Sequence, residues 1–234
     1  MNENYIKWHP HVSYLAVDFF NIDFLDEMSK SNSITIVADI RKSQELITYS
    51  SSPQYFRDKL LTLLEDCKAI IKDHSGIFDR FTGDGFICYF NENLCNIFDL
   101  NYYQCAVSAI ASIQKRANEI FPEWVADLKK VPIEKIGLSI GVDEGEINYS
   151  EKNGHFIAIG EPSVWATRMC SAALADEVIV NNRPYNKLMR MACIESVSEV
   201  NSTTKGGENF LAHKVQLKDI FQSTRVHFLS GDKR

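Results

Sequence analysis

Two aspartates stand where a rigid backbone would hold a carboxylate in place. Asp39 ends a short β-branched segment, 34–38, and Asp84 lies at the tip of a Gly-Asp-Gly turn. Carboxylates that face each other repel unless a cation lies between them. Hard oxygen donors with open coordination positions suit Mg²⁺ or Mn²⁺ that carries a nucleoside triphosphate. The pair therefore indicates a divalent-metal site, while each aspartate alone also fits a plain role as a cap or turn residue.

The elements around the two aspartates decide whether they meet. Periodicity and turn residues predict helices over about 53–75, 102–120, 161–174 and 184–191, and strands over 34–38, 77–81, 86–90, 136–142, near 147, 156–159, 178–180, 193–200 and 209–216. Ser51 or Ser52 is the expected N-cap of the first helix. The order β-α-β-β-α-β predicts an α+β fold with a ferredoxin-like core and a mainly antiparallel sheet. In that order the first strand and the hairpin commonly lie side by side, so the two carboxylates would converge at one sheet edge.

Length and composition limit the class of protein. The chain has 234 residues, 45% hydrophobic and 24% charged, which suits one globular domain and not a disordered chain. The formal net charge of −6 argues against a general nucleic-acid binder or an anionic-membrane binder. The six cysteines form no C-x-x-C pair, and neither a secretory leader nor a long apolar span is evident. We therefore expect a cytoplasmic protein with reduced thiols.

Four motifs carry a resemblance to a known family. They are Val37-Ala38-Asp39-Ile40, Arg80-Phe81-Thr82-Gly83-Asp84-Gly85-Phe86, Gly141-Val142-Asp143-Glu144-Gly145-Glu146, and Ala158-Ile159-Gly160-Glu161-Pro162 with Arg168 eight residues after the glycine. Together they resemble the catalytic domain of class III nucleotidyl cyclases. The resemblance covers about residues 33–216, so 1–32 would be an N-terminal lead-in and 217–234 a C-terminal tail.

The resemblance implies a site and a reaction. Asp39 and Asp84 would bind two divalent metal ions, Mn²⁺ or Mg²⁺, with the backbone carbonyl of Ile40 as a further ligand. Arg168 would stabilise charge on the α-phosphate while the ribose 3′ oxygen attacks the α-phosphorus and releases pyrophosphate. The aspartates would come from one chain and the arginine from the other, which implies a homodimer with two shared sites. The implied triphosphate contacts are the amides after Asp39, through Ile40, Arg41, Lys42 and Ser43, and the side chain of Lys205.

The positions that read the base in this family differ here. Arg80 stands four residues before Asp84, where adenylyl cyclases have Lys and guanylyl cyclases have Glu. Ile157 stands where adenylyl cyclases have Asp or Thr. Arg only donates hydrogen bonds and Ile accepts none, so an exocyclic amine or guanine N1–H would lack an acceptor. Uracil, with two carbonyl acceptors, suits such a pocket, which favours UTP, and Tyr49 could add a contact to the base. Two plainer interpretations stay open: Arg80 as a surface residue paired with a neighbouring acid, and Ile157 as core filling.

A single catalytic domain with these changes looks like the pyrimidine cyclases of bacterial anti-phage (Pycsar) systems. This implies a cytoplasmic lyase that makes cyclic UMP as a second messenger for a separate effector, which it does not bind, with no nucleic-acid or membrane partner. The alternatives are a cytidylate or adenylate cyclase, and a catalytically silent nucleotide-sensing or dimerisation module. A diguanylate cyclase fits less well, because its Gly-Gly-Asp/Glu-Glu-Phe hairpin is absent from the sequence.

Overall fold

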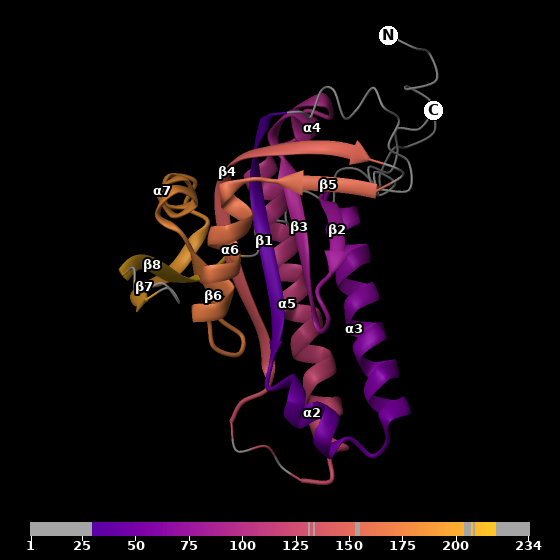
Figure 1. Ribbon diagram of the computed structural model, residues 1–234. Helices are drawn as coiled ribbons and strands as arrows, with labels where there is room; N and C mark the ends of the chain where they lie inside the picture. The colour runs from indigo at the N-terminus through magenta and orange to yellow at the C-terminus, as the bar shows by residue number, and fades with distance from the viewer. Residues whose placement is uncertain are drawn as a thin grey trace, which may run out of the picture.

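A mainly antiparallel sheet forms the centre of the computed structural model, which describes residues 30–218 apart from 131, 133, 153, 154, 204–206 and 208 (Figure 1). The strand order is β2-β3-β1-β4-β6-β8-β7, and the pairs are antiparallel except for β4 with β6. The strands are β1 (Ser31–Arg41), β2 (Ile77–Phe81), β3 (Gly85–Asn91), β4 (Gly137–Lys152), β6 (Val178–Val180), β7 (Ile194–Thr203) and β8 (Asn209–Leu217). A further strand, β5 (His155–Ile159), pairs with the outer end of β4 in an arm at the top of Figure 1.

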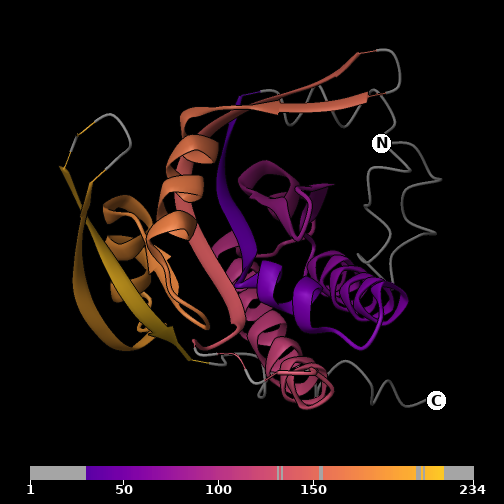
Figure 2. The ribbon, with the colours of Figure 1, turned by 60° about the horizontal axis from the view of Figure 1, so that its bottom comes forward.

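Helices cover both faces of the sheet (Figure 2). They are α2 (Ser43–Tyr49), α3 (Pro53–Asp73), α4 (Glu92–Ile97), α5 (Tyr102–Ala126), α6 (Glu161–Ala172) and α7 (Asn182–Arg190). The helices α3 and α5 pack together against one face, while α6 lies on the other face against β4 and β1. Side chains alternate along β1, so Ile36 and Ala38 belong to the α3–α5 core and Val37 belongs to the core under α6. Asp39 and Arg41 therefore lie on the face that α6 covers.

The predicted fold class is confirmed. The elements β1, α3, β2, β3, α5 and β4 follow one another along the chain and give the sheet order β2-β3-β1-β4, which is the ferredoxin-like arrangement. Ser52 is the N-cap of α3, because its side chain accepts a hydrogen bond from the Tyr55 amide at 3.1 Å. Pro53 lies in the first turn, where its missing N–H costs nothing.

The structure differs from the predicted elements at α5, at β4 and at two short helices. The helix α5 continues past the predicted end near 120 to Ala126, through Pro122, because Phe121 and Trp124 stack with their ring centroids 6.1 Å apart and hold the last turn in place. Residues 137–152 form one strand, so the predicted break before 147 was wrong. The helices α2 and α4 were not predicted, since neither is long enough to show helical periodicity.

The cysteines all lie in the interior of the protein. All six are buried free thiols, which is the environment expected of reduced cysteines. Burial raises the pKa of the Cys67 thiol to about 12 and keeps it protonated. In the part of the chain that the structure describes, no helix is long and apolar enough to cross a bilayer.

Candidate functional site

The ladder between β1 and β3 brings Asp39 and Asp84 together. Asp39 lies opposite Gly85, the residue that follows Asp84. Position 85 requires glycine, because a Cβ atom there would lie 2.2 Å from the Ala38 carbonyl oxygen. Gly83 has a φ of 89°, a left-handed conformation that favours glycine, and so closes the hairpin. The glycines on both sides of Asp84 thus let the hairpin tip press against the end of β1.

The two carboxylates repel each other. The pKa of Asp39 lies above its ordinary value, first because the carboxyl is partly buried and second because Asp84 is near, while the Arg41 guanidinium acts in the opposite direction. Two carboxylates are hard oxygen donors, which suit a divalent ion, and the Ile40 carbonyl stays a predicted further ligand. Among the described residues, no cluster of three His, Cys, Asp or Glu side chains could enclose a metal ion. A metal ion bound here would therefore take further ligands from a nucleotide or from water.

The predicted phosphate loop leads into the start of α2. Lys42 is the N-cap residue with a φ of 63°, and its carbonyl accepts from the amides of Glu45 and Leu46. The amides of Ser43 and Gln44 lie in the first turn, where a helix offers no carbonyl to receive them. The ammonium of Lys42 pairs with Glu134 at 2.7 Å. The backbone amides around Ser43 are thus the part of this loop suited to bind an anion. The Lys42 ammonium is instead paired with the Glu134 carboxylate.

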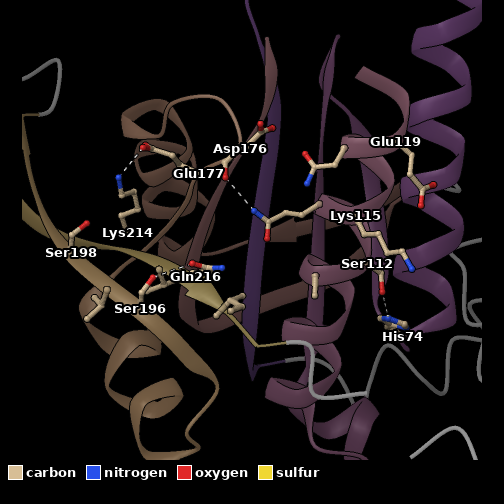
Figure 3. A pocket seen from close by; sticks show the side chains of 16 residues that line it. His74, Ser112, Lys115, Glu119, Asp176, Glu177, Ser196, Ser198, Lys214 and Gln216 are labelled. Carbon is tan, nitrogen blue, oxygen red and sulfur yellow. Dashed lines mark hydrogen bonds and ion pairs between the residues drawn. The ribbon is translucent and has the colours of Figure 1, made fainter. Parts of the chain in front are cut away.

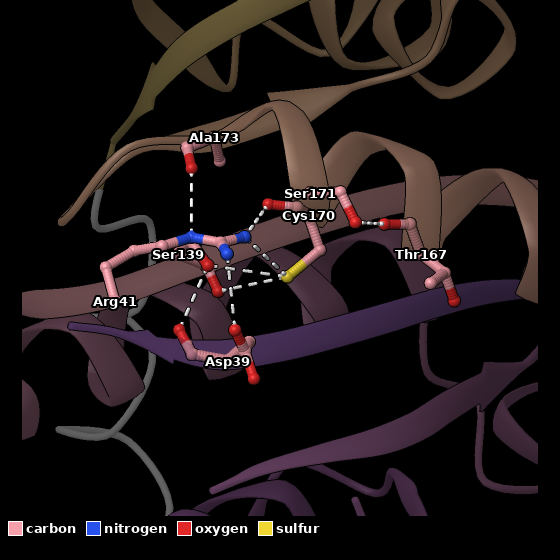
Figure 4. A network of polar contacts seen from close by, with 7 residues as sticks. All are labelled: Asp39, Arg41, Ser139, Thr167, Cys170, Ser171 and Ala173. Carbon is pink, nitrogen blue, oxygen red and sulfur yellow. Dashed lines mark hydrogen bonds and ion pairs between the residues drawn. The ribbon is translucent and has the colours of Figure 1, made fainter. Parts of the chain in front are cut away.

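Protein groups hold the side chain of Arg41 (Figure 4). Its Nη1 lies 3.3 Å from Asp39 Oδ2, its Nε donates to the Ala173 carbonyl at 3.1 Å, and its Nη2 donates to the Cys170 carbonyl. Ser139 joins the same network, because its Oγ donates to the Asp39 carbonyl at 3.0 Å and lies 3.4 Å from Cys170 Sγ. Because protein groups engage its guanidinium, Arg41 would contact a triphosphate through its backbone amide.

Arg168 lies on a different side of α6 from this network. Its guanidinium carbon is 4.3 Å from the centroid of the Trp165 ring, and Trp165 packs edge-on against Phe210 of β8. Arg168 and Cys170 are two residues apart, which is a rotation of about 200° around a helix. Their side chains therefore leave α6 on nearly opposite sides. Within one chain, Arg168 points away from the side of α6 that contacts Ser139.

Arg80 lies at the surface and pairs with a neighbouring acid, as in the plainer of its two interpretations. Its side chain is 58% exposed on β2 and pairs with Asp79 at 3.7 Å, whose own side chain is 3% exposed. Asp79 also accepts a hydrogen bond at 3.3 Å from the Tyr89 hydroxyl, which lies 3.4 Å from Ser163 Oγ. Burial raises the pKa of Asp79, and the charge of Arg80 and the Tyr89 hydrogen bond oppose this. A base-reading role for Arg80 stays a prediction.

Ile157 and Tyr49 are both half-buried. Ile157 lies on β5, opposite Ser150, and is not among the core clusters of the described residues. Its role in the base pocket stays a prediction. Strand alternation puts Ile157 on the face opposite to Phe156 and Ala158, which pack into the core. Tyr49 is the last residue of α2, and the ammonium nitrogen of Lys130 lies 5.2 Å from the centroid of its ring.

One predicted site residue cannot be placed. Lys205 lies outside the described residues, as do most of the predicted lead-in, 1–32, and most of the predicted tail, 217–234. Their proposed roles stay predictions.

Sequence reasoning missed several partners of the site residues. Asp79 gave a usable signal, because a carboxylate between aromatic residues of a strand needs a partner when it is buried. Ser139 gave none, since a small polar residue between Leu138 and Ile140 is common in strands. The contacts of Arg41 with α6 were equally invisible, because they join residues more than a hundred positions apart in the sequence.

A cavity of about 1200 Å³ lies away from this site, between α5 and the strands β7 and β8 (Figure 3). None of the predicted site residues lines it. Its polar side chains bind one another: His74 contacts Ser112 at 3.1 Å and Lys214 donates to Glu177 at 3.1 Å. The cavity is thus separate from the paired aspartates.

Solved structures with a similar fold are catalytic domains of nucleotide cyclases. The adenylyl cyclase CyaB from P. aeruginosa has a TM-score of 0.63 and 17% identity over 81% of this chain and 95% of its own. The guanylyl cyclase Cya2 has a TM-score of 0.63 and 17% identity over 83% of this chain and 98% of its own. The guanylate cyclase domain of RhGC from Catenaria anguillulae, solved in complex with GTP, has a TM-score of 0.59 and 16% identity over 80% of this chain and 97% of its own.

The similarity lies in the structure and not in the sequence. No protein-family model matches the chain, and no curated protein matches it in sequence. At this level of identity the comparison establishes the fold, which is that of the class III cyclase catalytic domain.

Proposed function

We propose that this protein is a metal-dependent nucleotidyl cyclase. Its substrate would be a pyrimidine nucleoside triphosphate, UTP in preference, and its products the 3′,5′-cyclic monophosphate and pyrophosphate. The observation that carries the proposal is the convergence of Asp39 and Asp84 at the end of β1. A shared fold does not define a reaction, but paired carboxylates beside first-turn helix amides suit a metal-bound triphosphate.

Each part of the site has a separate task. Asp39, Asp84 and the Ile40 carbonyl hold two divalent ions, Mn²⁺ or Mg²⁺, which when bound lower the pKa of the ribose 3′-hydroxyl and offset phosphate charge. The backbone from Arg41 to Ser43 binds triphosphate oxygens, with Lys205 as a further contact. Arg168 donates to the α-phosphate oxygens as charge develops on them. The 3′-hydroxyl would lose its proton to solvent, its oxygen would form a bond to the α-phosphorus, and the bond between the α-phosphorus and the bridging α–β oxygen would break to release pyrophosphate.

The proposed preference for uracil rests on side-chain chemistry at three positions. Arg80 is exposed and anchored by the buried Asp79, so it can donate to a base carbonyl. Ile157 offers no acceptor, so the amine of cytosine or adenine would lose a hydrogen bond on binding. Tyr49 is the proposed third contact with the base. Cytidylate and adenylate cyclase activities are the alternatives that a product assay separates.

The proposed assembly is a homodimer with two shared sites. The orientation of Arg168 supports it, because this side chain leaves α6 on the side away from the Asp39 network of its own chain. Two inactive variants, Asp39→Asn and Arg168→Ala, should therefore complement each other. In an equal mixture, half of the dimers carry one intact site of two, so about a quarter of wild-type activity should return. No recovery after verified subunit exchange would contradict the shared site.

The activity itself is tested with purified protein, Mn²⁺ and each of the four nucleoside triphosphates. We expect cyclic UMP as the main product by chromatography and mass spectrometry. Asp39→Asn and Asp84→Asn should each lower the rate more than about 100-fold, since a metal ligand is lost. Asp58→Asn, an exposed position on α3, is the matched control and should leave the rate unchanged. Metal and nucleotide binding without any cyclic product would instead indicate a catalytically silent module.

The biological role is proposed on the sequence resemblance to Pycsar enzymes alone. The cyclic nucleotide would serve as a second messenger in anti-phage defence, read by a separate effector. Cells that carry the gene together with the adjacent genes of its native locus should resist phage, and the Asp39→Asn variant should remove that resistance. Equal plaque counts with the wild-type and variant genes would contradict the role without touching the enzymatic proposal.

A further inference from the structure

An arginine from another element closes the C-terminal end of α6. The last carbonyls of a helix have no partner within it, and the last turn of α6 contains no basic residue. Arg41 of β1 lies at this end of the helix: its Nε donates to the Ala173 carbonyl at 3.1 Å, and its Nη2 donates to the Cys170 carbonyl, which also accepts from the Ala173 amide (Figure 4). A cation at a helix C-terminus also interacts favourably with the helix dipole.

The same guanidinium holds a proposed metal ligand. Its Nη1 lies 3.3 Å from Asp39 Oδ2. Asp39 and Arg41 are two residues apart on β1, so both side chains leave the strand on the face that α6 covers. Ser139 adds a second tie, since its Oγ donates to the Asp39 carbonyl and touches Cys170 Sγ. A single planar group with three engaged nitrogens therefore joins Asp39 to the end of α6.

The helix α6 packs closely against the sheet along β4 and β1. A Cβ atom on Gly141 of β4 would lie 2.1 Å from the Ala166 carbonyl oxygen and 2.1 Å from the Cys170 nitrogen. The helix backbone thus rests directly on β4, and Arg41 fixes its end along β1. The same helix carries Arg168, which the proposed function assigns to the site completed by the partner chain.

We propose that Arg41 is a positioning residue that couples the metal site of one chain to the placement of Arg168 on α6. This inference rests on the proposed function. A divalent cation between Asp39 and Asp84 competes with Arg41 for the Asp39 carboxylate, while the two α6 carbonyls keep hold of the guanidinium. Metal binding therefore removes the carboxylate that fixes the guanidinium on the β1 side, and the hold of Arg41 on the end of α6 becomes less rigid. Through α6, each metal site influences the arginine that serves the other site of the dimer.

Two measurements on the nucleotide-free protein test the coupling. The first is Mn²⁺ affinity by calorimetry. The second is amide hydrogen exchange at the end of α6, where the Ala173 amide donates to the Met169 and Cys170 carbonyls at 3.1 Å. In the wild-type protein, saturating Mn²⁺ should speed exchange there by about threefold or more, because local stability falls when the tie loosens.

Two substitutions separate the charge of Arg41 from its shape. Arg41→Gln removes a positive charge beside the metal ligand, so Mn²⁺ should bind about two- to fivefold more tightly. Exchange at Ala173 should already be fast and should no longer respond to Mn²⁺. Arg41→Lys keeps the charge, so the Mn²⁺ affinity should stay at the wild-type level. Its single ammonium cannot bind two carbonyls and a carboxylate together, so exchange should again be fast.

Arg57→Gln is the matched control, because Arg57 is exposed on α3 and pairs only with its neighbour Asp58 among the ion pairs of the described residues. It should change neither readout. A Mn²⁺ response of exchange in Arg41→Gln equal to that of the wild type would overturn the coupling. Weaker Mn²⁺ binding by Arg41→Gln would overturn it as well, and Arg41→Lys decides if the glutamine variant fails to fold. Wild-type protein that forms product but shows no response at α6 overturns this inference alone, whereas absence of a cyclic product from all four nucleoside triphosphates overturns the proposed function too.

Discussion

Burial of Asp143 should make the stability of the protein fall as the pH rises through the acidic range. The residue is 5% exposed on β4. Burial raises its pKa from 3.8 to about 6, against the hydrogen bonds from the Glu144 amide and the Asn181 side chain and the charge of Arg183. Between these two pKa values the folded chain keeps a proton that the unfolded chain releases, so a rise in pH costs stability. Below both values neither state is charged, and the penalty disappears.

The size of the effect follows from the pKa difference. One pKa unit corresponds to about 1.4 kcal/mol, so the charged carboxylate lowers the free energy of unfolding by about 3 kcal/mol at pH 7.5 and by about 1 kcal/mol at pH 4.5. Asp143→Asn removes the titrating group. The free energy of unfolding of the variant, minus that of the wild type, should therefore increase by about 2 kcal/mol between these two pH values.

Urea unfolding followed by circular dichroism at several pH values measures this difference. A constant offset between the proteins is expected, since the substituted amide cannot reproduce every hydrogen bond of the carboxyl group, so the pH dependence is the test. Glu146→Gln, an exposed position on the same strand, is the control and should follow the wild type. Wild-type and Asp143→Asn curves that run parallel from pH 4.5 to 7.5 would show that the buried carboxyl keeps an ordinary pKa.

Three further changes have defined outcomes. Gly141→Ala should destabilise the fold by about 1–3 kcal/mol in urea unfolding and lower activity, because its Cβ meets the backbone of Cys170. Ser52→Ala should cost about 1 kcal/mol through loss of the α3 N-cap, whereas Ser51→Ala should cost much less. Ile157→Asp should raise the ratio of ATP to UTP turnover by about tenfold, because it supplies an acceptor for the adenine amine; an unchanged ratio of kcat/KM values would remove Ile157 from the base pocket.

The parts of the site that the sequence predicted are governed by local rules. The Gly-Asp-Gly turn places Asp84 at a hairpin tip because glycine permits the left-handed φ of 89° at Gly83. The order of strands and helices then puts that hairpin beside β1, where Asp39 meets Gly85. Periodicity along the chain and turn chemistry are sufficient for both steps, so the paired carboxylates could be found without a structure.

The parts that the sequence did not predict depend on long-range contacts. Arg41 was expected at the triphosphate through its amide, yet its side chain reaches Ala173, 132 residues away in the chain. Tyr89 reaches Ser163, 74 residues away, and links Asp79 to the start of α6. Such contacts depend on the distance between layers, which periodicity along one strand or helix does not contain. They also decide which side chains stay available to a ligand.

The glycines of β4 lie inside a continuous strand and make room for α6, rather than marking a turn. The sequence predicted separate strands over 136–142 and near 147, but one strand continues from Gly137 to Lys152 and contains both Gly141 and Gly145. The glycines serve the layer above: a Cβ on Gly141 would meet the backbone of α6, and one on Gly145 would lie 2.9 Å from Pro162 at the start of that helix. Near both of its ends, α6 therefore packs against β4 at a glycine, where no side chain separates helix from strand. A helix held this way has little freedom to move sideways, so the tie between Arg41 and its C-terminal carbonyls is the contact best placed to transmit a change at Asp39.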